Sequence, residues 1–178
     1  MEFQNLVESR RSIRSFQENV TITNEEFEKM IECALEAPSW KNTETARYYV
    51  VNTPEKIEEV STTALPAFNQ KNCKNASIVV TTFEKNRSGF ERDGSPTNEI
   101  GQEWGAYDLG LSNSLFVLKA KEMGYDTLIM GIRDAAKLRE SLDIPDSQEV
   151  VSVIAVGKRT EDAERPVRKT LERVAKFY

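Results

Sequence analysis

The stretch EWGAYDLGLSNSLFVLKAKEM, residues 103–123, decides how the rest of the chain is interpreted. Its spacing predicts a helix that ends at Gly124, with apolar side chains on almost every side. A helix on the surface of a domain keeps a polar half. We therefore expect this helix to be buried on most sides, either in the centre of the domain or at a subunit interface. Its apolar residues are Trp104, Ala106, Tyr107, Leu109, Leu111, Leu115, Phe116, Val117, Leu118 and Ala120.

The flanking segments predict helices and strands without regular βαβ alternation, which indicates the α+β class. Thr23 and Glu26 form a capping box at the start of one helix, and Asp134 is placed to cap another. Runs rich in β-branched and aromatic residues predict the strands. The expected helices are a short one around 3–10, one from Thr23 to before Pro38, and 53–65 and 134–142, and the expected strands are 47–52, 77–83, 126–132 and 150–157.

Composition limits the chemistry available to this chain of 178 residues. It contains no histidine, which excludes Ser-His-Asp and Cys-His nucleophile pairs, imidazole bases, proximal haem histidines and zinc sites with histidine ligands. Its two cysteines cannot build a four-cysteine zinc or iron–sulfur site within one chain. The formal net charge of −5 argues against a nucleic-acid partner, and no apolar run is long enough to span a membrane. An enzyme of this composition would use carboxylates, lysine, tyrosine, backbone amides or a cofactor.

The sequence shows no repeat, linker or signal peptide, so we expect residues 1–178 to form one domain of a cytoplasmic protein. Cys33 falls in a helical pattern and Cys73 in a polar loop, and two ordinary thiols are favoured over a disulfide. The loop 86–102 is long enough to be a lid or a substrate-selecting element, although a disordered surface loop is an equal alternative. The tail 158–178 is charged and has no core pattern of its own.

Two basic groups stand near the ends of the chain. Residues 10–14 contain three arginines and Ser12 without an acid between them. Arginine presents a planar fork of donors that matches phosphate oxygens, so a phosphate site is one interpretation and a solvated basic turn is the other. The second group, residues 165–169, has the pattern of a solvated charged face.

Two further segments have the chemistry to face a flat ligand. Residues 37–42, Ala-Pro-Ser-Trp-Lys-Asn, lie between a helix and a strand, and an Asn amide can pair with the edge of a planar heterocycle. Gly131, at the end of a predicted strand, would let a flat ring approach the backbone closely. Taken alone, an ordinary loop and a buried strand explain these two segments better.

In combination these segments resemble the nitroreductase family of FMN-dependent oxidoreductases. The resemblance is carried by Arg-Arg-Ser-Ile-Arg-Ser-Phe at 10–16, Ala-Pro-Ser-x-x-Asn at 37–42, the apolar helix, Met-Gly at 130–131 and the basic tail. These features follow one another in the family's order from Arg10 to about Glu172.

The resemblance implies an α+β fold with a central mixed or antiparallel sheet of four to five strands, flanked by helices, and the long helix buried at a homodimer interface. It also implies two FMN sites in that interface, each lined by both subunits, and a tail 158–178 that wraps the partner. At the FMN phosphate and ribityl chain the implied residues are Arg10, Arg11, Ser12, Arg14, Arg168 and Lys169. Along the flavin, partly from the partner subunit, they are Pro38, Ser39, Trp40 and Asn42, and at the ring they are Ile129, Met130 and Gly131.

The implied activity is a ping-pong transfer of two electrons from NADH or NADPH, through flavin N5, to a nitro, quinone or similar small acceptor. No catalytic side chain and no metal is implied, because the flavin carries the chemistry. Glu44 and Ala46 stand where the family usually has an amide and an aromatic residue, which leaves recognition of the flavin edge open. Two other functions are compatible with the residues: storage or sensing of FMN without turnover, and a non-catalytic dimeric interaction protein.

Overall fold

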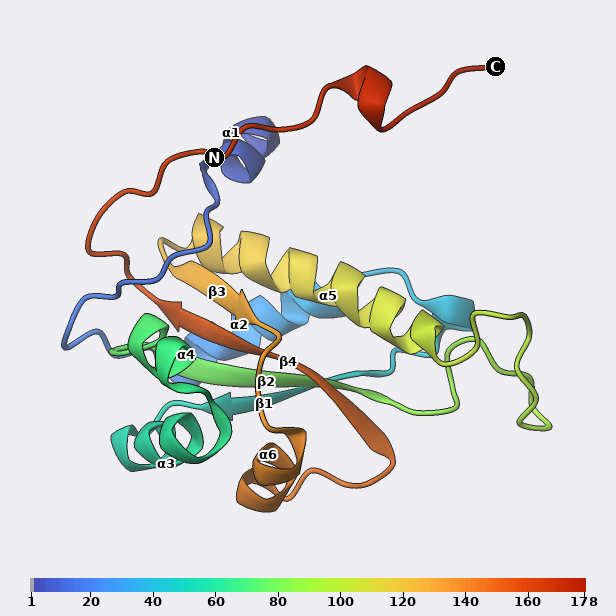
Figure 1. Cartoon of the computed structure of the whole chain (residues 1–178), viewed down its shortest axis with the longest axis horizontal. Helices are drawn as coiled ribbons and strands as arrows, with labels where there is room; N and C mark the ends of the chain where they lie inside the picture. Colours follow the sequence, from blue (N-terminus) through green and yellow to red (C-terminus); the bar gives the residue numbers. More distant parts are fainter. Residues whose placement is uncertain (1) are drawn as a thin grey trace.

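The computed structural model describes residues 2–178, and its centre is a four-stranded antiparallel sheet (Figure 1). The order β1-β2-β4-β3 places β2 and β4 in the middle, where both faces are covered and nearly every side chain is buried. The α+β prediction is therefore confirmed, with four strands. Their bounds are Ala46–Val51 (β1), Ser77–Glu84 (β2), Asp126–Met130 (β3) and Gln148–Gly157 (β4), each within two residues of the expected ends.

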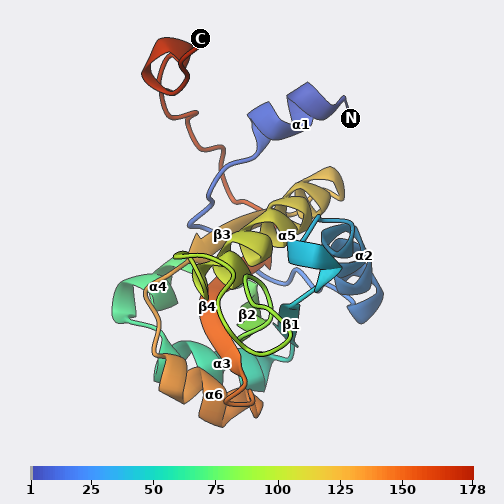
Figure 2. The same ribbon diagram turned by 90° about the vertical axis from the view of Figure 1, so that its right-hand side faces the viewer.

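Helices cover both faces of this sheet (Figures 1 and 2). Helices α2, Asn24–Leu35, and α5, Glu103–Glu122, pack together on one face. Helices α3, Pro54–Ala64, and α6, Ala135–Leu142, pack together on the other. Alternation along β2 joins the two layers, because Val79 packs with α2 and α5 whereas its neighbours in sequence join the other core cluster.

Helix α5 carries polar residues on its buried face and apolar residues on its outward face, the opposite of a usual surface helix. Asp108 and Asn113 are buried on the side that faces the domain, whereas Tyr107 is 59% exposed and Leu111 and Leu115 are only half-buried. A single chain therefore covers one face of α5 and leaves an apolar face outward. The expectation that this helix lies in the centre of the domain is therefore wrong, and its location at a subunit interface stays a prediction.

Short helical segments are the elements that the sequence pattern did not predict. Helix α4, Ala67–Asn72, and the 3-10 turn η1, Trp40–Asn42, each have fewer residues than the period needs to become visible. Cys73 lies in the turn that follows α4, as expected for a loop residue, but its side chain is 2% exposed. Burial raises the pKa of the Cys73 thiol to about 11.

The C-terminal tail passes helix α1 near the start of the chain and then runs away from the rest of the molecule (Figure 1). Helix α1, Phe3–Ser9, leads into a segment that pairs with the chain just beyond β4 through the Phe16–Arg159 bridge. Beyond it the tail runs past α1, where Arg165 pairs with Glu8 at 3.3 Å, and then extends into solvent through the turn η2, Leu171–Arg173. Within residues 2–178, no helix is long and apolar enough to cross a membrane.

Candidate functional site

The arginine-rich segment lies along the outer edge of β3. Ser12 bridges to Thr127, and the Ile13 N–H donates to the Thr127 carbonyl at 3.0 Å. Arg10, half-buried beside this edge, has a pKa lowered by burial and by the positive charges of Arg168 and Arg11. The structure therefore brings arginines from both ends of the chain together, and neither Arg10 nor Arg168 forms an ion pair within residues 2–178.

The other members of the predicted phosphate group differ in how free they are. Arg11 donates to the carbonyls of Glu8 and Arg10 at 2.6 and 2.7 Å, and its Nε is buried without a partner among the described residues. Arg14 is exposed, and its nearest acceptor is the Ser12 carbonyl at 3.4 Å. Lys169 is exposed and has no partner in the described part of the chain.

Arg14 also shares a cleft of about 240 Å³ with Glu161 and Asp162 of the tail. Two acids on the cleft wall oppose the binding of an anion there. Arg10 and Arg168 are therefore better placed than Arg14 to meet a phosphate.

The end of β3 presents an open backbone. Met130 is 3% exposed and packs in the core, so only its backbone can approach a ligand. Ile129 is 50% exposed, and a Cβ added at Gly131 would meet no described heavy atom within 4 Å. The four residue-to-residue steps from Thr127 to Gly131 span about 13 Å of extended chain. A ligand with a phosphate at one end and a flat ring at the other could follow this edge.

The η1 loop is tightly wound. Lys41, Asn42 and Glu44 all have left-handed backbone conformations, with φ of 47°, 53° and 48°. Each such non-glycine residue costs about 1–3 kcal/mol and persists only where its surroundings impose the conformation. Here the Ser39 carbonyl accepts from Asn42 N at 3.1 Å, and the Ser39 hydroxyl accepts from Glu44 N at 3.0 Å. Strain of this kind is concentrated at functional sites.

A buried carboxylate on α5 holds this loop in place. Asp108 is 4% exposed, and its Oδ2 accepts from Trp40 N at 2.9 Å and from Ser88 Oγ at 2.6 Å. Ser88 Oγ also lies 2.9 Å from Thr43 Oγ1 and 3.3 Å from Thr45 Oγ1. Asp108 is not among the predicted site residues, although an acid inside an apolar helix is a signal for such a role.

Two side chains of the η1 loop are already engaged. The Trp40 ring packs on Trp104 with centroids 4.8 Å apart, and its Nε1 is buried without a partner in residues 2–178. The Asn42 amide donates to Glu44 Oε1 at 2.7 Å, which leaves the Asn42 carbonyl oxygen free to accept. Glu44, which departs from the family pattern, therefore orients Asn42.

These two groups of residues lie at opposite corners of the sheet. The η1 loop leads into Ala46, which pairs with Phe83 near one end of β2, whereas Ser12 lies beside Thr127 at the other end of the sheet. β1 and β3 are also the two outer strands, about 14 Å apart. One chain therefore does not bring the η1 loop and the arginine cluster together.

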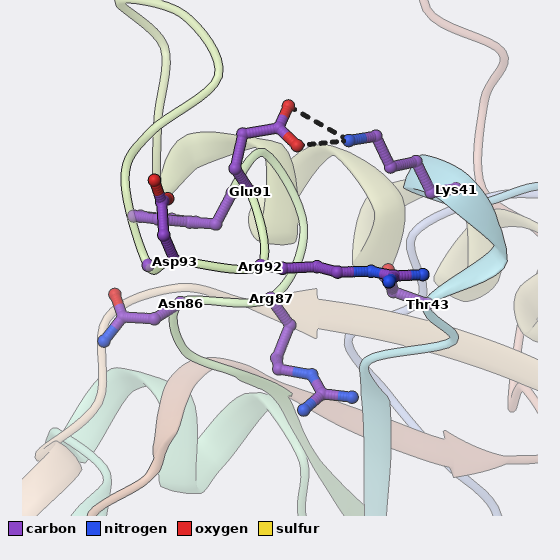
Figure 3. A pocket seen from close by; sticks show the side chains of 9 residues that line it. Lys41, Thr43, Asn86, Arg87, Glu91, Arg92 and Asp93 are labelled. Carbon is purple, nitrogen blue, oxygen red and sulfur yellow. Dashed lines mark hydrogen bonds and ion pairs between the residues drawn. The ribbon is translucent and has the colours of Figure 1, made fainter.

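A cavity of about 920 Å³ lies between the η1 loop and the loop that follows β2 (Figure 3). Lys41 and Thr43 line one side, and residues 86–87 and 90–94 line the other. An ion pair crosses the cavity, because Lys41 Nζ lies 3.0 Å from Glu91 Oε2. The loop is hydrogen-bonded rather than structureless, since Thr97 N donates to the Gly89 carbonyl at 2.8 Å.

A model of the nitroreductase family matches residues 7–158. The chain belongs to the nitroreductase family. Membership makes it an FMN-dependent NAD(P)H oxidoreductase, which confirms the class of enzyme and the cofactor expected from the sequence.

Relatives of similar length support this assignment. The proposed NAD(P)H nitroreductase MhqN of Bacillus subtilis is 29% identical over 200 residues, with 93% of this chain and 92% of MhqN covered. The proposed NAD(P)H nitroreductase YdgI of the same species is 25% identical over 205 residues, with 99% and 97% covered. The crystal structure of a proposed nitroreductase in complex with FMN from Exiguobacterium sibiricum superposes with a TM-score of 0.88 at 22% identity, with 100% and 98% covered. That structure shows the same fold.

The residues of this nitroreductase fit an FMN ligand in two respects. Arg10 and Arg168 lie close enough for the charge of Arg168 to lower the pKa of Arg10, and neither forms an ion pair within residues 2–178, so both guanidiniums can pair with a phosphate. The space in front of Gly131 is open, and a glycine lets a flat ring approach the backbone closely there.

Proposed function

We propose that residues 1–178 form one domain and that two copies form a homodimer with FMN in the interface. The observation that carries this proposal is the separation of the η1 loop from the arginine cluster at opposite corners of the sheet. A symmetric partner supplies its own η1 loop to the other chain's arginines. The outward apolar face of α5, with Tyr107 and Leu111, is available for that contact.

The proposed activity is the transfer of two electrons from NAD(P)H to a nitro, quinone or similar small acceptor, with donor and acceptor binding in turn at the same place. When bound, FMN supplies the redox chemistry. The chain supplies binding and orientation, and no side chain is proposed as catalytic. Water can protonate the acceptor, so the absence of histidine from the sequence is no obstacle.

Each predicted binding residue has a proposed task. Arg10, Arg11, Ser12 and Arg14 hold the phosphate and ribityl chain, and Arg168 with Lys169 completes the phosphate site. Pro38, Ser39, Trp40 and Asn42 of the partner border the flavin, with the free Asn42 carbonyl oxygen as an acceptor for a ring N–H. Ile129 and the backbone of Met130 and Gly131 face the ring. We also propose that the tail 158–178 wraps the partner and that the protein is cytoplasmic.

The test combines colour, stability and reduction. Added FMN should remain with the protein through gel filtration at the mass of a dimer, and should raise the melting temperature by mass action. Anaerobic NADH or NADPH should bleach the bound flavin, and a nitro or quinone acceptor should restore its colour.

The rival functions predict different results. A protein that stores or senses FMN would stay yellow when NAD(P)H is added. A non-catalytic dimeric interaction protein would gain neither colour nor thermal stability from FMN. A monomer that retains FMN fully would contradict the proposed two-chain site.

A further inference from the structure

The cavity beside the η1 loop has a charge pattern that the proposed flavin site does not use. Its five charged lining residues are Lys41, Arg87, Glu91, Arg92 and Asp93. Lys41 and Glu91 neutralise each other across the cavity, with Nζ 3.0 Å from Oε2. The remaining charges are two guanidiniums and one carboxylate.

That carboxylate does not serve the arginines. Asp93 Oδ1 accepts from Ser95 N at 3.0 Å and from Ser95 Oγ at 2.6 Å, within its own turn. The guanidinium groups of Arg87 and Arg92 form no hydrogen bond and no ion pair with any of residues 2–178. Figure 3 shows Arg92 extending toward Thr43 and Arg87 turned to the same side, whereas Asp93 points away. Both guanidiniums are therefore available to a ligand in the cavity.

The backbone that carries these arginines is fixed without a ligand. Ser88, next to Arg87, is 2% exposed and donates to Asp108 at 2.6 Å. Phe90 and Pro96 form an antiparallel bridge, and Glu91 N donates to the Ser95 carbonyl at 2.8 Å on either side of Arg92. A ligand would order the two side chains but not the loop, which lowers the cost of binding.

We propose that Arg87 and Arg92 bind the oxyanion group, carboxylate or phosphate, of a substrate that enters this cavity. Guanidinium forks match such groups geometrically, and charge-assisted hydrogen bonds are stronger than neutral ones. The site is distinct from the arginine cluster at β3, which lies at the opposite corner of the sheet.

The cavity's position gives this binding a consequence for the reaction, and this step rests on the proposed function. Lys41 and Thr43, on the cavity wall, flank Asn42 in the loop proposed to border the flavin. A substrate held by its anionic end at Arg87 and Arg92 would direct its other end toward the ring. The oxyanion belongs either to the acceptor or to the nicotinamide dinucleotide, and the experiment separates the two sources.

The experiment compares 4-nitrobenzoate with 4-nitrobenzamide, which differ mainly in charge. In the FMN-loaded protein, the double substitution R87Q/R92Q should raise KM for the anionic substrate about tenfold, because two charge-assisted contacts are lost. KM for 4-nitrobenzamide and the visible spectrum of bound FMN should not change. The matched control K85Q removes one positive charge two residues from Arg87, outside the cavity wall, and should leave both KM values unchanged.

The dinucleotide is tested in the same variants. If the oxyanion is a phosphate of the electron donor, KM for NADPH or NADH rises in R87Q/R92Q with either acceptor. In that case the wild type itself has similar KM values for 4-nitrobenzoate and 4-nitrobenzamide. If the oxyanion belongs to the acceptor, both dinucleotide KM values stay unchanged. Either result supports the site.

Equilibrium titration of the FMN-loaded protein with 4-nitrobenzoate, without NAD(P)H, separates this proposal from the proposed function. Binding that R87Q/R92Q abolishes supports the anion site even if no acceptor is reduced. Turnover of 4-nitrobenzamide, with no change in the titration or in any KM of R87Q/R92Q, would overturn the anion site and leave the oxidoreductase intact.

Discussion

The arginine cluster at β3 and the η1 loop before β1 differ in whether their charged side chains have partners within the chain. Arg10 and Arg168 repel each other and have no acidic partner within residues 2–178. Asp108, beside η1, is buried and accepts two hydrogen bonds through one oxygen. The first region holds charge that its own chain leaves uncompensated, and the second uses its charge to fix backbone.

This difference separates residues that bind from residues that position. An uncompensated cationic cluster costs stability until an anion arrives, so its substitution should affect ligand affinity more than folding. A satisfied buried carboxylate stabilises the loop that it holds, so its substitution should affect folding first. The two regions therefore predict opposite responses to mutation.

The largest effect is expected at the arginine cluster. R10Q/R168Q should weaken FMN binding about a hundredfold, because two charge-assisted contacts to the phosphate are lost. Fluorescence titration of the FMN-free protein measures this change. Without FMN, the single variant R168Q should have a melting temperature slightly above that of the wild type, because the substitution removes the charge that repels Arg10.

Lys169→Gln is the matched control for that experiment, since it removes the same charge at the next position from an exposed side chain. It should weaken FMN binding less than R168Q does. Equal losses in the two variants would mean that net charge of the tail matters and that the placement of Arg168 beside Arg10 does not.

Asp108 should give the second largest effect. D108A leaves the Trp40 N–H and the Ser88 hydroxyl without their acceptor, and should lower the free energy of unfolding by about 2 kcal/mol. Urea unfolding of the FMN-free protein measures the change. D108N keeps one carbonyl oxygen as acceptor and should lose less. If D108A unfolds like the wild type, Asp108 does not hold the η1 loop.

Features that depend on neighbouring residues in the sequence could be predicted, whereas features that depend on contacts between distant residues could not. The strand around Ile78 and the capping box of Thr23 and Glu26 are local, and both are present, with Glu26 N 3.3 Å from Thr23 Oγ1. The role of Asp108 depends on Trp40 and Ser88, far away in the sequence. Spacing alone could not reveal these partners.

The predicted site was affected by the same limit. The donor chemistry of the arginine motif is local, so the sequence offered a phosphate site as one of two interpretations. The proximity of Arg168 to Arg10 depends on the fold and could not be read from the motif. The hydrogen bond from Asn42 to Glu44 depends on left-handed conformations at both residues. Side-chain patterns carry no information about such conformations when glycine is absent.

The smallest effect is expected at Asp126, the acid that pairs with a third arginine, Arg159, at the β3 edge. Arg159 Nε donates to Asp126 Oδ2 at 2.8 Å, and Lys121 Nζ lies 3.1 Å from Oδ1. Burial alone would raise the pKa of Asp126, but the bonds from Arg159 and Lys121 outweigh it and hold the pKa below its ordinary value. Arg159 is thus compensated where Arg10 is not.

A lowered folded-state pKa means that Asp126 stabilises the fold fully above the unfolded-state pKa of about 3.9, and that this stabilisation is lost as pH falls through the folded-state value. Urea unfolding of the wild type and D126N should therefore differ by a constant amount at pH 5–7 and converge below about pH 4. The control D162N removes the other acid that pairs with Arg159. The Asp162 side chain is 94% exposed, so this substitution should change stability little at any pH. A difference between wild type and D126N that persists undiminished at pH 3 would show that the carboxylate's charge is not what stabilises this edge. The contrast between paired Arg159 and unpaired Arg10 would then lose its electrostatic basis.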